Sequence, residues 1–544
     1  MQVAEVERGR AAIAGIAQRR PKALGVALDV RGRDGARLRS GDDPRGAQLE
    51  GLAIAVGLDG DRDDAVLLLE RALLCDPALD LGGLLAPLWQ GQPAPYLVFA
   101  DAHRALGVLA ARGVSAPTRF GCATAASTLL GEGADRRRDH RPIDRSVREL
   151  LGRELPDGLL TVSSTSVRLA CEAEALLELL RAMTPMLRDR GLARVYSFEC
   201  SLIPAVVAME AVGIRVDAPR FERIASGWVR ERAELDVDAE VEGVVERAAR
   251  LDKLISTYRY WARDYVGQDQ RMRCRLHPLA ADSGRFSCSE PNLQQVPAEH
   301  TAPGLRACFV AAPEHKLIIA DYAQIELRVA AHLAPCEAMR AVFRAGRDPH
   351  RATAANLAGK PEHEIDSHER KLAKAVNFGF LFGMGARRFA QYARDSYGLE
   401  LDEREAAAAR EAFFRTFPGI AAWHRRIGAM SRAGEREDIT VVTAMGRRRT
   451  FLAGHFSFNT ALNIPVQGTA AEGFKIAMLK LEPALAQIGG RGVLVVHDEY
   501  IAEVPAAQAE RGREIVEQVM IAAMAELVDS VPIVVEAEIA DHWG

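Results

Sequence analysis

The stretch LVVHDEYIAEV, from Leu494 to Val504, places a histidine and two acids between two apolar runs that have the composition of β-strands. A tight hairpin usually carries Asn-Gly or Asp-Gly at its tip, because glycine tolerates positive φ angles. This turn has no glycine, so His497, Asp498 and Glu499 are poorly explained as turn formers. Adjacent carboxylates are instead typical ligands of a hard divalent cation. We therefore expect another acid elsewhere in the chain to complete the site.

The stretch KLIIADYAQIELRVAAHLA, which starts at Lys316, supplies that acid. Four apolar residues end at Asp321, and the apolar spacing after it fits a helix better than a strand. An acid at the end of a buried strand is costly unless it is paired or binds a metal. Asp321 and Asp498 at one sheet edge could share two divalent ions for in-line phosphoryl transfer. The alternative is a helix N-cap at Asp321 and a solvated turn at Asp498.

A third stretch, RKLAKAVNFGFLFGMG, repeats side chains of similar kind every four residues. Arg370, Lys374, Phe378 and Phe382 would therefore lie on one helix face. Two cations followed by two rings suit a nucleoside triphosphate laid along the helix, with the phosphates on the cations and the base near a ring. His350, in RDPHRATAA, could add a phosphate contact. The alternative is an amphipathic helix with a basic edge, which is commoner for such spacing.

The composition sets the class of protein. A chain of 544 residues predicts two to four domains, and 48% hydrophobic with 26% charged residues is typical of a soluble globular protein. The net charge of -4 argues against a uniformly basic nucleic-acid binder but leaves room for a local basic groove. The eight cysteines contain no C-x-x-C pair, which favours a reduced compartment. Without a signal-like start or a long apolar run, we expect a cytoplasmic protein with no membrane partner.

The order of predicted elements divides the chain into two parts. Up to about residue 190, strand-like runs such as LGVALDV and PYLVFA alternate with helical stretches, which indicates an α/β domain. The pattern from Leu202 to Tyr258 is helical, and its second half is a charged arm. Strands return at KLIIADY, helices fill about 346 to 435, and a strand, helix and hairpin segment closes the chain.

Together these stretches resemble the DNA polymerase I family, also called family A. DYAQIELRVAAHLA resembles its motif A, RKLAKAVNFGFLFGMG its motif B and VHDEYIAEV its motif C. GRFSCSEPNLQQVP and NIPVQGTAAEG resemble two further family segments that touch template and primer. The likeness runs in the family's order from about residue 195 to the end. It implies an α/β (α+β) fold class, with a ribonuclease-H-like exonuclease-type domain followed by a right-hand polymerase.

The resemblance also implies domain boundaries. Residues 1–190 would form a degenerate 3′–5′ exonuclease-like domain, and residues 191–544 the polymerase domain. Within the polymerase we expect a shortened thumb at about 215–262, a palm at about 263–345 and 436–544, and fingers at about 346–435. No 5′-nuclease domain is expected ahead of residue 1.

The resemblance gives each matching residue an expected role. The residues expected to carry the chemistry are Asp321, Asp498, Lys374 and Glu499. Two Mg²⁺ ions, or Mn²⁺ in their place, would bind Asp321, Asp498 and the carbonyl of Tyr322. The residues expected to bind the dNTP are Arg370, Lys374, Phe378, His350, Glu326, Gln324 and Phe382. The residues expected to contact DNA are Arg285, Arg306, Asn292, Gln294, Asn463, Gln467 and His497.

Two substitutions depart from the family near the expected substrate site. Glu326 would be the steric gate against a ribose 2′-hydroxyl, and the family usually places a tyrosine where this chain has Phe382. Without that hydroxyl, Glu326 is expected to stay unpaired or to bind water, which would alter sugar discrimination. Asn459 stands where the family commonly has arginine, so one cation facing the DNA is expected to be missing.

Two further departures concern the arm and the first domain. The helical arm is shorter than the family's thumb, and fewer phosphate contacts predict short, distributive synthesis. In the first domain, Asp29 lacks the acid two residues later that would complete a D-x-E pair. Ala105 stands at the second acidic motif, and Arg168 and Glu172 replace the tyrosine and aspartate of the third. Because hydrolysis there would need carboxylates that hold two metals, we expect a catalytically inactive domain.

The sequence thus predicts a monomeric, template-directed DNA polymerase that acts in repair or replication. It would add dNTPs to a primer 3′-hydroxyl on primer–template DNA, with low processivity and without proofreading. The alternatives are a specialised damage-tolerant polymerase, a non-catalytic DNA-binding relic and a working exonuclease.

Overall fold

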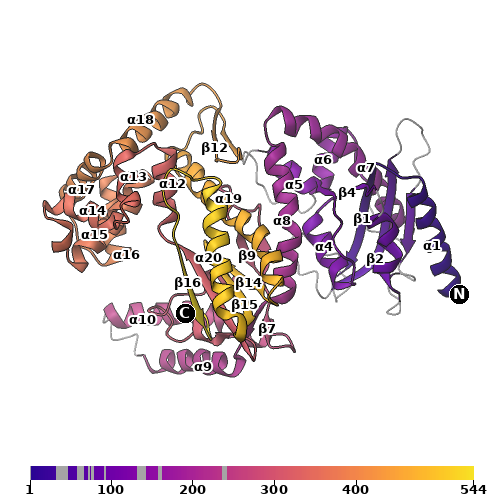
Figure 1. Cartoon of the computed structure of the whole chain (residues 1–544), viewed down its shortest axis with the longest axis horizontal. Helices are drawn as coiled ribbons and strands as arrows, with labels where there is room; N and C mark the ends of the chain where they lie inside the picture. Colours follow the sequence, from indigo (N-terminus) through magenta and orange to yellow (C-terminus); the bar gives the residue numbers. More distant parts are fainter. Residues whose placement is uncertain are drawn as a thin grey trace.

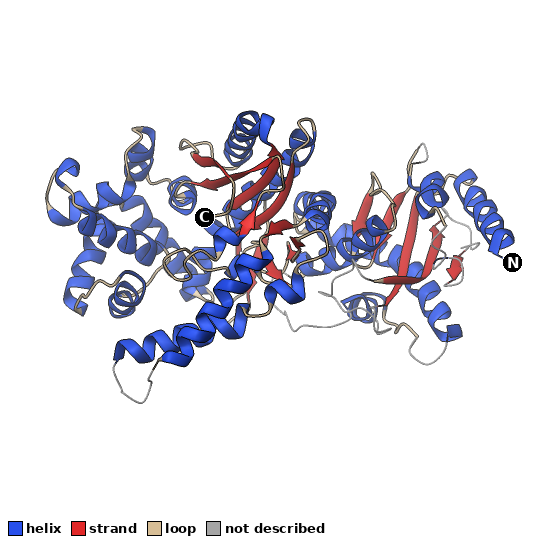
Figure 2. Cartoon of the chain, turned by 90° about the horizontal axis from the view of Figure 1, so that it is seen from below, coloured by secondary structure: helices blue, strands red, loops and turns tan. Residues whose placement is uncertain are grey.

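The computed structural model describes residues 2–31, 47–57, 66–70, 74, 79–90, 93–131, 142–156, 162–235 and 242–544. Figure 1 shows the N-terminal part at the right and a helical lobe at the left, with the C-terminal strands and helices between them. Figure 2 shows two separate β-sheets, one in the middle of the view and one in the N-terminal part at the right, each with helices beside it.

The N-terminal part is built on a five-stranded sheet. Its strands are β1 Ala23–Arg31, β2 Gln48–Gly57, β3 Val66–Glu70, β4 Tyr96–Phe99 and β5 Phe120–Cys122. The spatial order is β3-β2-β1-β4-β5, with β1 to β3 antiparallel and β1, β4 and β5 parallel. Its helices are α1 Gln2–Gln18, α3 Leu81–Trp89, α4 Ala102–Ala111, α5 Ala123–Leu130, α6 Pro142–Leu151 and α7 Val162–Asp189. α7 packs so tightly on β1 that a Cβ at Gly25 would lie 1.9 Å from the carbonyl oxygen of Ala173.

Helix α8, Ala193–Val212, lies between the two parts of the chain (Figure 1). Among the described residues it alone is long and apolar enough to cross a membrane, and 56% of its apolar window is buried inside the protein. Its Glu199 is 1% exposed and accepts hydrogen bonds from Arg447 and, at 2.7 Å, from the Nζ of Lys475. Lys475 belongs to α19, Phe458–Ala486, and Arg447 lies in the segment before it, so buried ion pairs as well as packing hold α8 to the C-terminal part.

A four-stranded antiparallel sheet forms the centre of the C-terminal part. Its strands are β11 His315–Tyr322, β14 Arg491–Val496, β15 Glu499–Pro505 and β16 Val535–Ala540. They lie in the order β14-β15-β11-β16, which places Asp321 opposite both Glu499 and Glu536. α19 and α20 Ala509–Ala525 pack against this sheet and against each other, and α12 Ile325–Leu333 packs against α19. The register therefore brings acids from three strands to the same end of the sheet.

Helices make up the lobe at the left of Figure 1. They are α13 Glu337–Arg344, α14 Pro349–Ala358, α15 Ser367–Leu381, α16 Ala386–Tyr397, α17 Glu403–Thr416 and α18 Pro418–Ala433. α15 begins with a capping box, in which the side chains of Asp366 and Glu369 each accept a bond from the other's backbone N–H. Buried rings hold the lobe together, with Phe380 4.3 Å from Phe389 between ring centroids. The hairpin of β12 Ile439–Val442 and β13 Arg448–Phe451 follows.

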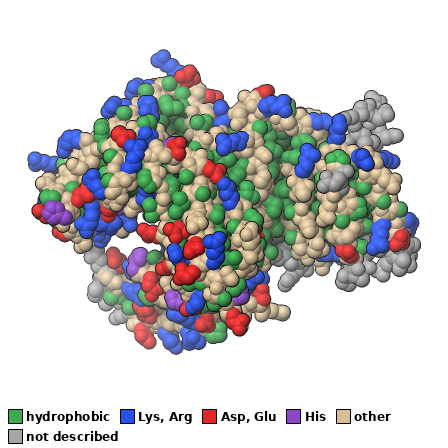
Figure 3. Space-filling view, viewed as in Figure 1, with side chains coloured by type: hydrophobic (Ala, Val, Ile, Leu, Met, Phe, Trp, Pro, Cys, Tyr) green, Lys and Arg blue, Asp and Glu red, His purple; other side chains and the backbone are tan. Residues whose placement is uncertain are grey.

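A helical arm and several short elements complete the fold. The arm consists of α9 Ala218–Glu234, α10 Glu242–Tyr258 and α11 Trp261–Tyr265. The short strands are β6 Ile214–Val216, β7 Arg271–Met272, β8 Arg275–His277, β9 Ser287–Ser289 and β10 Phe309–Val310. The 3₁₀ turns are η3 Leu293–Gln295, η4 Arg306–Cys308, η5 Glu362–Glu364 and η6 Ala506–Gln508. Figure 3 shows an opening between the helical lobe and the arm, with acidic side chains gathered beside it.

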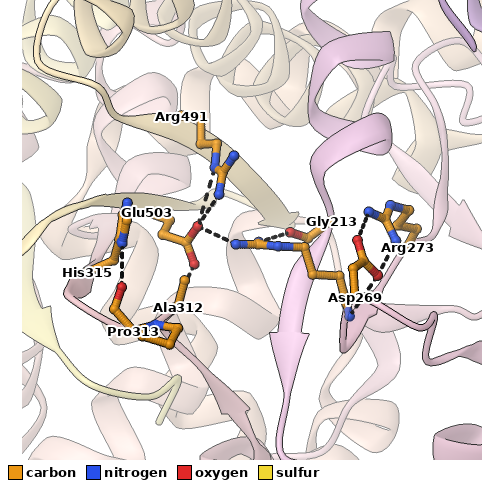
Figure 4. Close-up of polar contacts among 9 residues, drawn as sticks. Gly213, Asp269, Arg273, Ala312, Pro313, His315, Arg491 and Glu503 are labelled. Atoms are coloured by element: carbon orange, nitrogen blue, oxygen red, sulfur yellow. Dashed lines mark hydrogen bonds and ion pairs between the residues drawn. The ribbon is translucent and has the colours of Figure 1, made fainter.

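A buried carboxylate joins the base of the arm to the central sheet (Figure 4). Glu503 on β15 is 1% exposed and accepts bonds from Arg271 at 2.5 Å, from Arg491 at 2.8 Å and from the N–H of Ala312 at 2.9 Å. Arg271 also donates to the carbonyl of Gly213, which ends α8. Burial alone would raise the pKa of Glu503, but the hydrogen bonds from the two arginines outweigh burial and lower it. The charged cluster therefore fixes β7 against β15.

Candidate active site

Asp498 reaches the site because a strained two-residue turn separates β14 from β15. β14 ends at Val496 and β15 begins at Glu499, so only His497 and Asp498 form the turn. His497 has φ 59°, a left-handed conformation that side-chain-bearing residues seldom adopt. A residue held in such a conformation costs free energy and is characteristic of functional sites. The turn therefore places Asp498 at the sheet end where Asp321 also lies.

A pocket of about 580 Å³ opens at this end of the sheet. It is bounded by β11 and the start of α12, by the β14–β15 turn, by β16, and by α14 and α15. The lining residues are Arg285, Asp321, Tyr322, Ala323, Gln324, Ile325, Glu326, His350, Arg370, Lys374, Phe378, His497, Asp498 and Glu536. Acids thus face a basic helix across a space large enough for a nucleotide-sized ligand.

The acids that line the pocket, Asp321, Glu326, Asp498 and Glu536, form its acidic wall. The cations beside this wall do not fully neutralise its negative charge. Asp321 is accessible through the pocket but enclosed by its walls, and this enclosure, with repulsion from Asp498 and Glu499, raises the pKa of Asp321 to about 7. Burial also raises the pKa of Asp498, even though Arg285 opposes the shift. Carboxylates that repel one another in an enclosed space create a site that a cation stabilises.

The donor set fits a hard divalent ion. Asp321 and Asp498 offer carboxylate oxygens, and the backbone of Tyr322 lies at the same pocket wall. In the ranges that the structure covers, no group of three or more His, Cys, Asp or Glu side chains is already arranged to hold a metal. One or two carboxylates, completed by water and by substrate oxygens, are the usual protein ligands of Mg²⁺.

The basic wall is built on α15 and supported from α14. Arg370 donates from Nε to Oδ2 of Asp348 at 2.6 Å, a bond that leaves both Nη groups for other acceptors. Asp348 is also the N-cap of α14 and accepts the backbone N–H of His350. Lys374 lies one turn further along α15 and lines the same pocket. The two cations therefore lie on one helix face, as the four-residue spacing predicts.

His350 is held in its neutral form. It is 2% exposed, and burial lowers its pKa to about 4. Its Nδ1 lies 2.9 Å from the amide nitrogen of Asn377, a donor, so Nδ1 accepts and Nε2 carries the proton. The ring of Phe378 lies 5.9 Å from the imidazole, between centroids. His350 can therefore donate one hydrogen bond from Nε2 without carrying charge.

One expectation about the gate residue is wrong. Glu326 is neither unpaired nor dependent on water, because the guanidinium of Arg285 donates to its carboxylate. Burial still raises the pKa of Glu326, although Arg285 opposes the shift. Phe382 lies just beyond the end of α15 at Leu381 and is not among the residues that line the pocket. Its carbonyl accepts a hydrogen bond from Asn459 at 2.8 Å.

The pocket contains most but not all of the predicted site residues. Those outside its lining are Glu499, Phe382, Arg306, Asn292, Gln294, Asn463 and Gln467. Glu499 instead accepts a bond from the indole N–H of Trp543 at 2.7 Å. Sequence reasoning missed Glu536, Asp348 and Trp543. The Asp-Pro start of α14 is a helix-cap signal that could have drawn attention to Asp348, whereas Glu536 and Trp543 reach the site only through strand pairing and tertiary packing.

Residues 230–544 match the family model of DNA polymerase family A. The chain belongs to DNA polymerase family A. The polymerase family predicted from the sequence motifs is therefore confirmed.

Curated relatives in this family are similar over part of the chain. The DNA polymerase I of Aquifex aeolicus (strain VF5) is 38% identical over 275 residues, covering 49% of this chain and 46% of the relative. The thermostable DNA polymerase I of Thermus aquaticus is 37% identical over 325 residues, covering 57% of this chain and 37% of the relative. The DNA polymerase I of Rhizobium leguminosarum is 31% identical over 441 residues, covering 68% of this chain and 42% of the relative. The chain spans less than half the length of each of these relatives.

A solved structure matches the fold of this family A chain. The POL domain of Pol1 from M. smegmatis, in complex with DNA primer-template and dNTP, superposes with a TM-score of 0.81 and covers 96% of both chains at 24% identity. The match confirms the predicted α/β (α+β) polymerase fold. At this identity it is evidence for the fold alone.

Proposed function

We propose that this family A chain is a template-directed DNA polymerase that adds dNTPs to the 3′-hydroxyl of a primer. The observation that carries the proposal is the shared pocket, in which Asp321 and Asp498 face Arg370 and Lys374. A relic that only binds DNA would have no use for an enclosed acidic wall with a raised pKa at Asp321. The partners in this proposal are primer–template DNA and dNTPs, and the chain acts as a monomer.

The proposed metal ligands are Asp321, Asp498 and the carbonyl of Tyr322, with Glu499 close by. Two Mg²⁺ ions bound there, or Mn²⁺ in their place, would activate the primer hydroxyl and neutralise charge on the leaving oxygen. The residues of the chain supply geometry and the remaining charge. Arg370 would bind phosphate oxygens with its two Nη groups while Asp348 holds its Nε.

Other pocket residues have proposed roles toward the nucleotide. Lys374 would bind the phosphates and donate a proton to the departing pyrophosphate. His350 would donate to a phosphate from Nε2, and Phe378 would pack against the base and sugar. Gln324 and Glu326 would contact the sugar side, where Glu326 excludes a 2′-hydroxyl by occupying its space. Bound in this geometry, the α-phosphate is positioned for in-line attack, and pyrophosphate leaves.

The DNA side of the proposal rests on the residues that the motifs assign to it, of which Arg285 and His497 line the pocket. The proposed contacts are Arg285, Arg306, Asn292, Gln294, Asn463, Gln467 and His497. Hydrogen bonds to minor-groove acceptors that all correct pairs share would test the shape of the pair rather than its sequence. The proposed boundaries are those given by the motifs, with the first domain ending near residue 190 and the polymerase domain following.

Absence of proofreading is a further part of the proposal. Near the position expected for an exonuclease site, Arg31 lies 3.3 Å from the carboxylate of Asp29. Arg168 donates to Asp144 at 2.6 Å, and its Nε lies 3.9 Å from Glu172. Guanidinium groups thus provide the positive charge beside these acids that metal ions would provide in a nuclease. This arrangement supports an inactive first domain and, with the short arm, a role in repair or damage tolerance as well as replication.

Primer extension with Mg²⁺ and all four dNTPs tests the proposal. Wild-type protein should extend the primer, and Asp498→Ala should abolish extension while leaving DNA binding measurable. Glu411→Ala, which removes an acid whose side chain is 75% exposed on α17, is the matched control and should behave as wild type. Binding without extension would favour a DNA-binding relic. Shortening of the primer would instead reveal an exonuclease.

A further inference from the structure

Trp543 contacts two residues that have separate roles in the proposed function. Its indole N–H donates to the carboxylate of Glu499 at 2.7 Å. The guanidinium carbon of Arg306 lies 4.4 Å from the centroid of the indole ring. Trp543 is 1% exposed and, among the residues that the structure describes, is the largest of the fully buried side chains. One rigid side chain therefore connects Glu499, the first residue of β15, to a residue on the proposed DNA side.

The position of Trp543 is fixed by the segment that carries Arg306. Its backbone N–H donates to the carbonyl of Phe309 at 2.8 Å, and the two rings meet edge to face at 5.4 Å. One residue earlier, His542 forms a β-bridge with Val310. These contacts are made by β10, and η4, which begins with Arg306, directly precedes it, so Trp543 cannot move without moving the chain next to Arg306.

Arg306 is oriented from two sides. Its Nε donates to the carbonyl of Pro297 and its Nη2 to that of Val296, both at 3.2 Å. The indole face supports the guanidinium plane by a cation–π contact. Gly544, the residue after Trp543, also packs closely on Arg306, because a Cβ added to this glycine would lie 2.9 Å from the Cβ of Arg306. The remaining guanidinium donors can then face a phosphate or a base edge without rearrangement.

Glu499 needs a donor because of where it lies. It follows Asp498 directly and pairs with Asp321 across the sheet, so its carboxylate is next to two others. The indole N–H gives Glu499 one fixed direction, which keeps its charge at a set distance from the proposed metal ligands. Tryptophan suits this task because it combines a rigid apolar body with a single donor.

We propose that Trp543 is a positioning residue for polymerisation, which orients Glu499 for the chemical step through its N–H and Arg306 for DNA binding through its ring. The proposal rests on the proposed function, because it assigns no activity of its own. It predicts that loss of the indole N–H lowers the incorporation rate, whereas loss of the ring face raises the Kd for primer–template.

Single-turnover nucleotide incorporation and primer–template binding separate the two effects. Trp543→Phe keeps an aromatic face and removes the donor, so the maximal incorporation rate should fall about tenfold while the Kd for primer–template stays within about twofold. Trp543→Leu removes both, so the rate should fall similarly and the Kd should also rise about fivefold. In an Arg306→Ala background, Trp543→Leu should raise the Kd no further than Trp543→Phe does.

A second background tests the coupling to Glu499. If the donor acts through that carboxylate, Trp543→Phe should change the rate little in a Glu499→Ala protein, because the acceptor is already gone. Trp89→Phe is the control for loss of a buried indole. Trp89 lies on α3 and is 3% exposed. Within the described part of the chain no acceptor lies within hydrogen-bond distance of its N–H. The Trp89→Phe variant should therefore have the incorporation rate and the Kd of the wild type.

The outcomes are distinguishable. Suppose that the wild type is active and that Trp543→Phe lowers the incorporation rate by the same factor with and without Glu499→Ala. This result would overturn the positioning role of Trp543 and leave the proposed function intact. The same holds if Trp543→Phe lowers only the unfolding temperature and leaves rate and Kd unchanged. A wild type without any primer extension would overturn the proposed function and, with it, this role.

Discussion

The guanidinium of Arg285 donates a hydrogen bond to the carboxylate of Glu326, although 41 residues separate them in the chain. Both side chains line the pocket, with Glu326 in the first turn of α12. Phe382 has no hydroxyl to offer, and the partner of the proposed gate carboxylate is Arg285. Because Arg285 is also a proposed DNA contact, binding of the primer terminus and exclusion of the 2′-hydroxyl are expected to depend on the same ion pair.

Sugar discrimination is therefore expected to depend on Glu326 more than on the ring at position 382. Glu326→Ala should lower the ratio of dNTP to rNTP incorporation by about tenfold or more, because the space beside C2′ is opened. Phe382→Tyr should raise the ratio only if the new hydroxyl reaches Glu326 from its position just beyond α15. Steady-state kcat/KM values for matched dNTP and rNTP measure both. Equal ratios for wild type and Phe382→Tyr would show that the missing hydroxyl has no consequence.

Asp348 is expected to set nucleotide affinity by orienting Arg370. Asp348→Asn keeps an N-cap residue for α14 but removes the charge that holds Nε of Arg370 at 2.6 Å. Loss of a charge-assisted bond of about 1 to 2 kcal/mol should raise the KM for dNTP about five- to thirtyfold with little change in kcat. Steady-state kinetics with the exposed-acid variant Glu411→Ala as control measure this. A fall in KM would mean that Asp348 competes with the phosphates instead of assisting them.

Sequence patterns predicted the position of some site residues correctly and of others incorrectly. Asp321, Asp498, Arg370 and Lys374 could be placed together because strand ends and helix periodicity locate a side chain within its own element. Phe382 was placed on the same helix face, but α15 ends one residue earlier, and helix ends are poorly determined by periodicity.

Contacts between segments far apart in the chain escaped prediction. The pairing of Arg285 with Glu326 and that of Trp543 with Glu499 depend on how loops pack, and no local spacing encodes either of them. Glu536 reaches the site only through the register of β16 against β11. Sequence patterns therefore located the chemistry, and tertiary packing determined which groups orient it.

The first domain is expected to lack nuclease activity. Purified protein incubated with Mg²⁺ or Mn²⁺ and a mispaired 3′ end should leave the primer intact, because arginines lie beside Asp29, Asp144 and Glu172. Gel analysis of the labelled primer over time measures this. Metal-dependent shortening that Asp29→Ala abolishes would contradict the prediction, whereas shortening that persists in this variant would indicate a contaminating nuclease.

Synthesis is expected to be short in each binding event. The two long helices of the arm, α9 and α10, have 17 residues each. An arm of this size is expected to make few phosphate contacts with the duplex product, which predicts rapid dissociation. Extension from a preformed complex in the presence of a heparin or DNA trap should add few nucleotides and fewer still as salt rises. Long products at moderate salt would contradict the prediction and would imply duplex contacts beyond the arm.

His424 connects two helices of the lobe that carries the basic wall. On α18 it is 8% exposed, and its Nε2 lies 2.9 Å from the carbonyl oxygen of Leu381 at the end of α15. Burial lowers the pKa of His424 to about 4, with a bond to Leu381 opposing the shift and Arg410 adding to it. The folded lobe therefore favours the neutral imidazole, while the unfolded chain binds a proton at its ordinary pKa of 6.5.

Acidification is expected to weaken the contact between α15 and α18. Since the unfolded chain binds more protons than the folded one between pH 6.5 and about 4, stability is full above this window and falls as pH decreases through it. At about 1.36 kcal/mol per pKa unit, the loss near pH 5 is on the order of 2 kcal/mol. His424→Gln keeps a donor for Leu381 without a titrating ring, so hydrogen exchange of α15 and α18 should depend less on pH in this variant than in wild type. Other buried histidines, such as His350, titrate in both proteins and cancel in the comparison. Identical pH dependence would show that His424 is already solvated in the folded lobe and contributes nothing to its acid sensitivity.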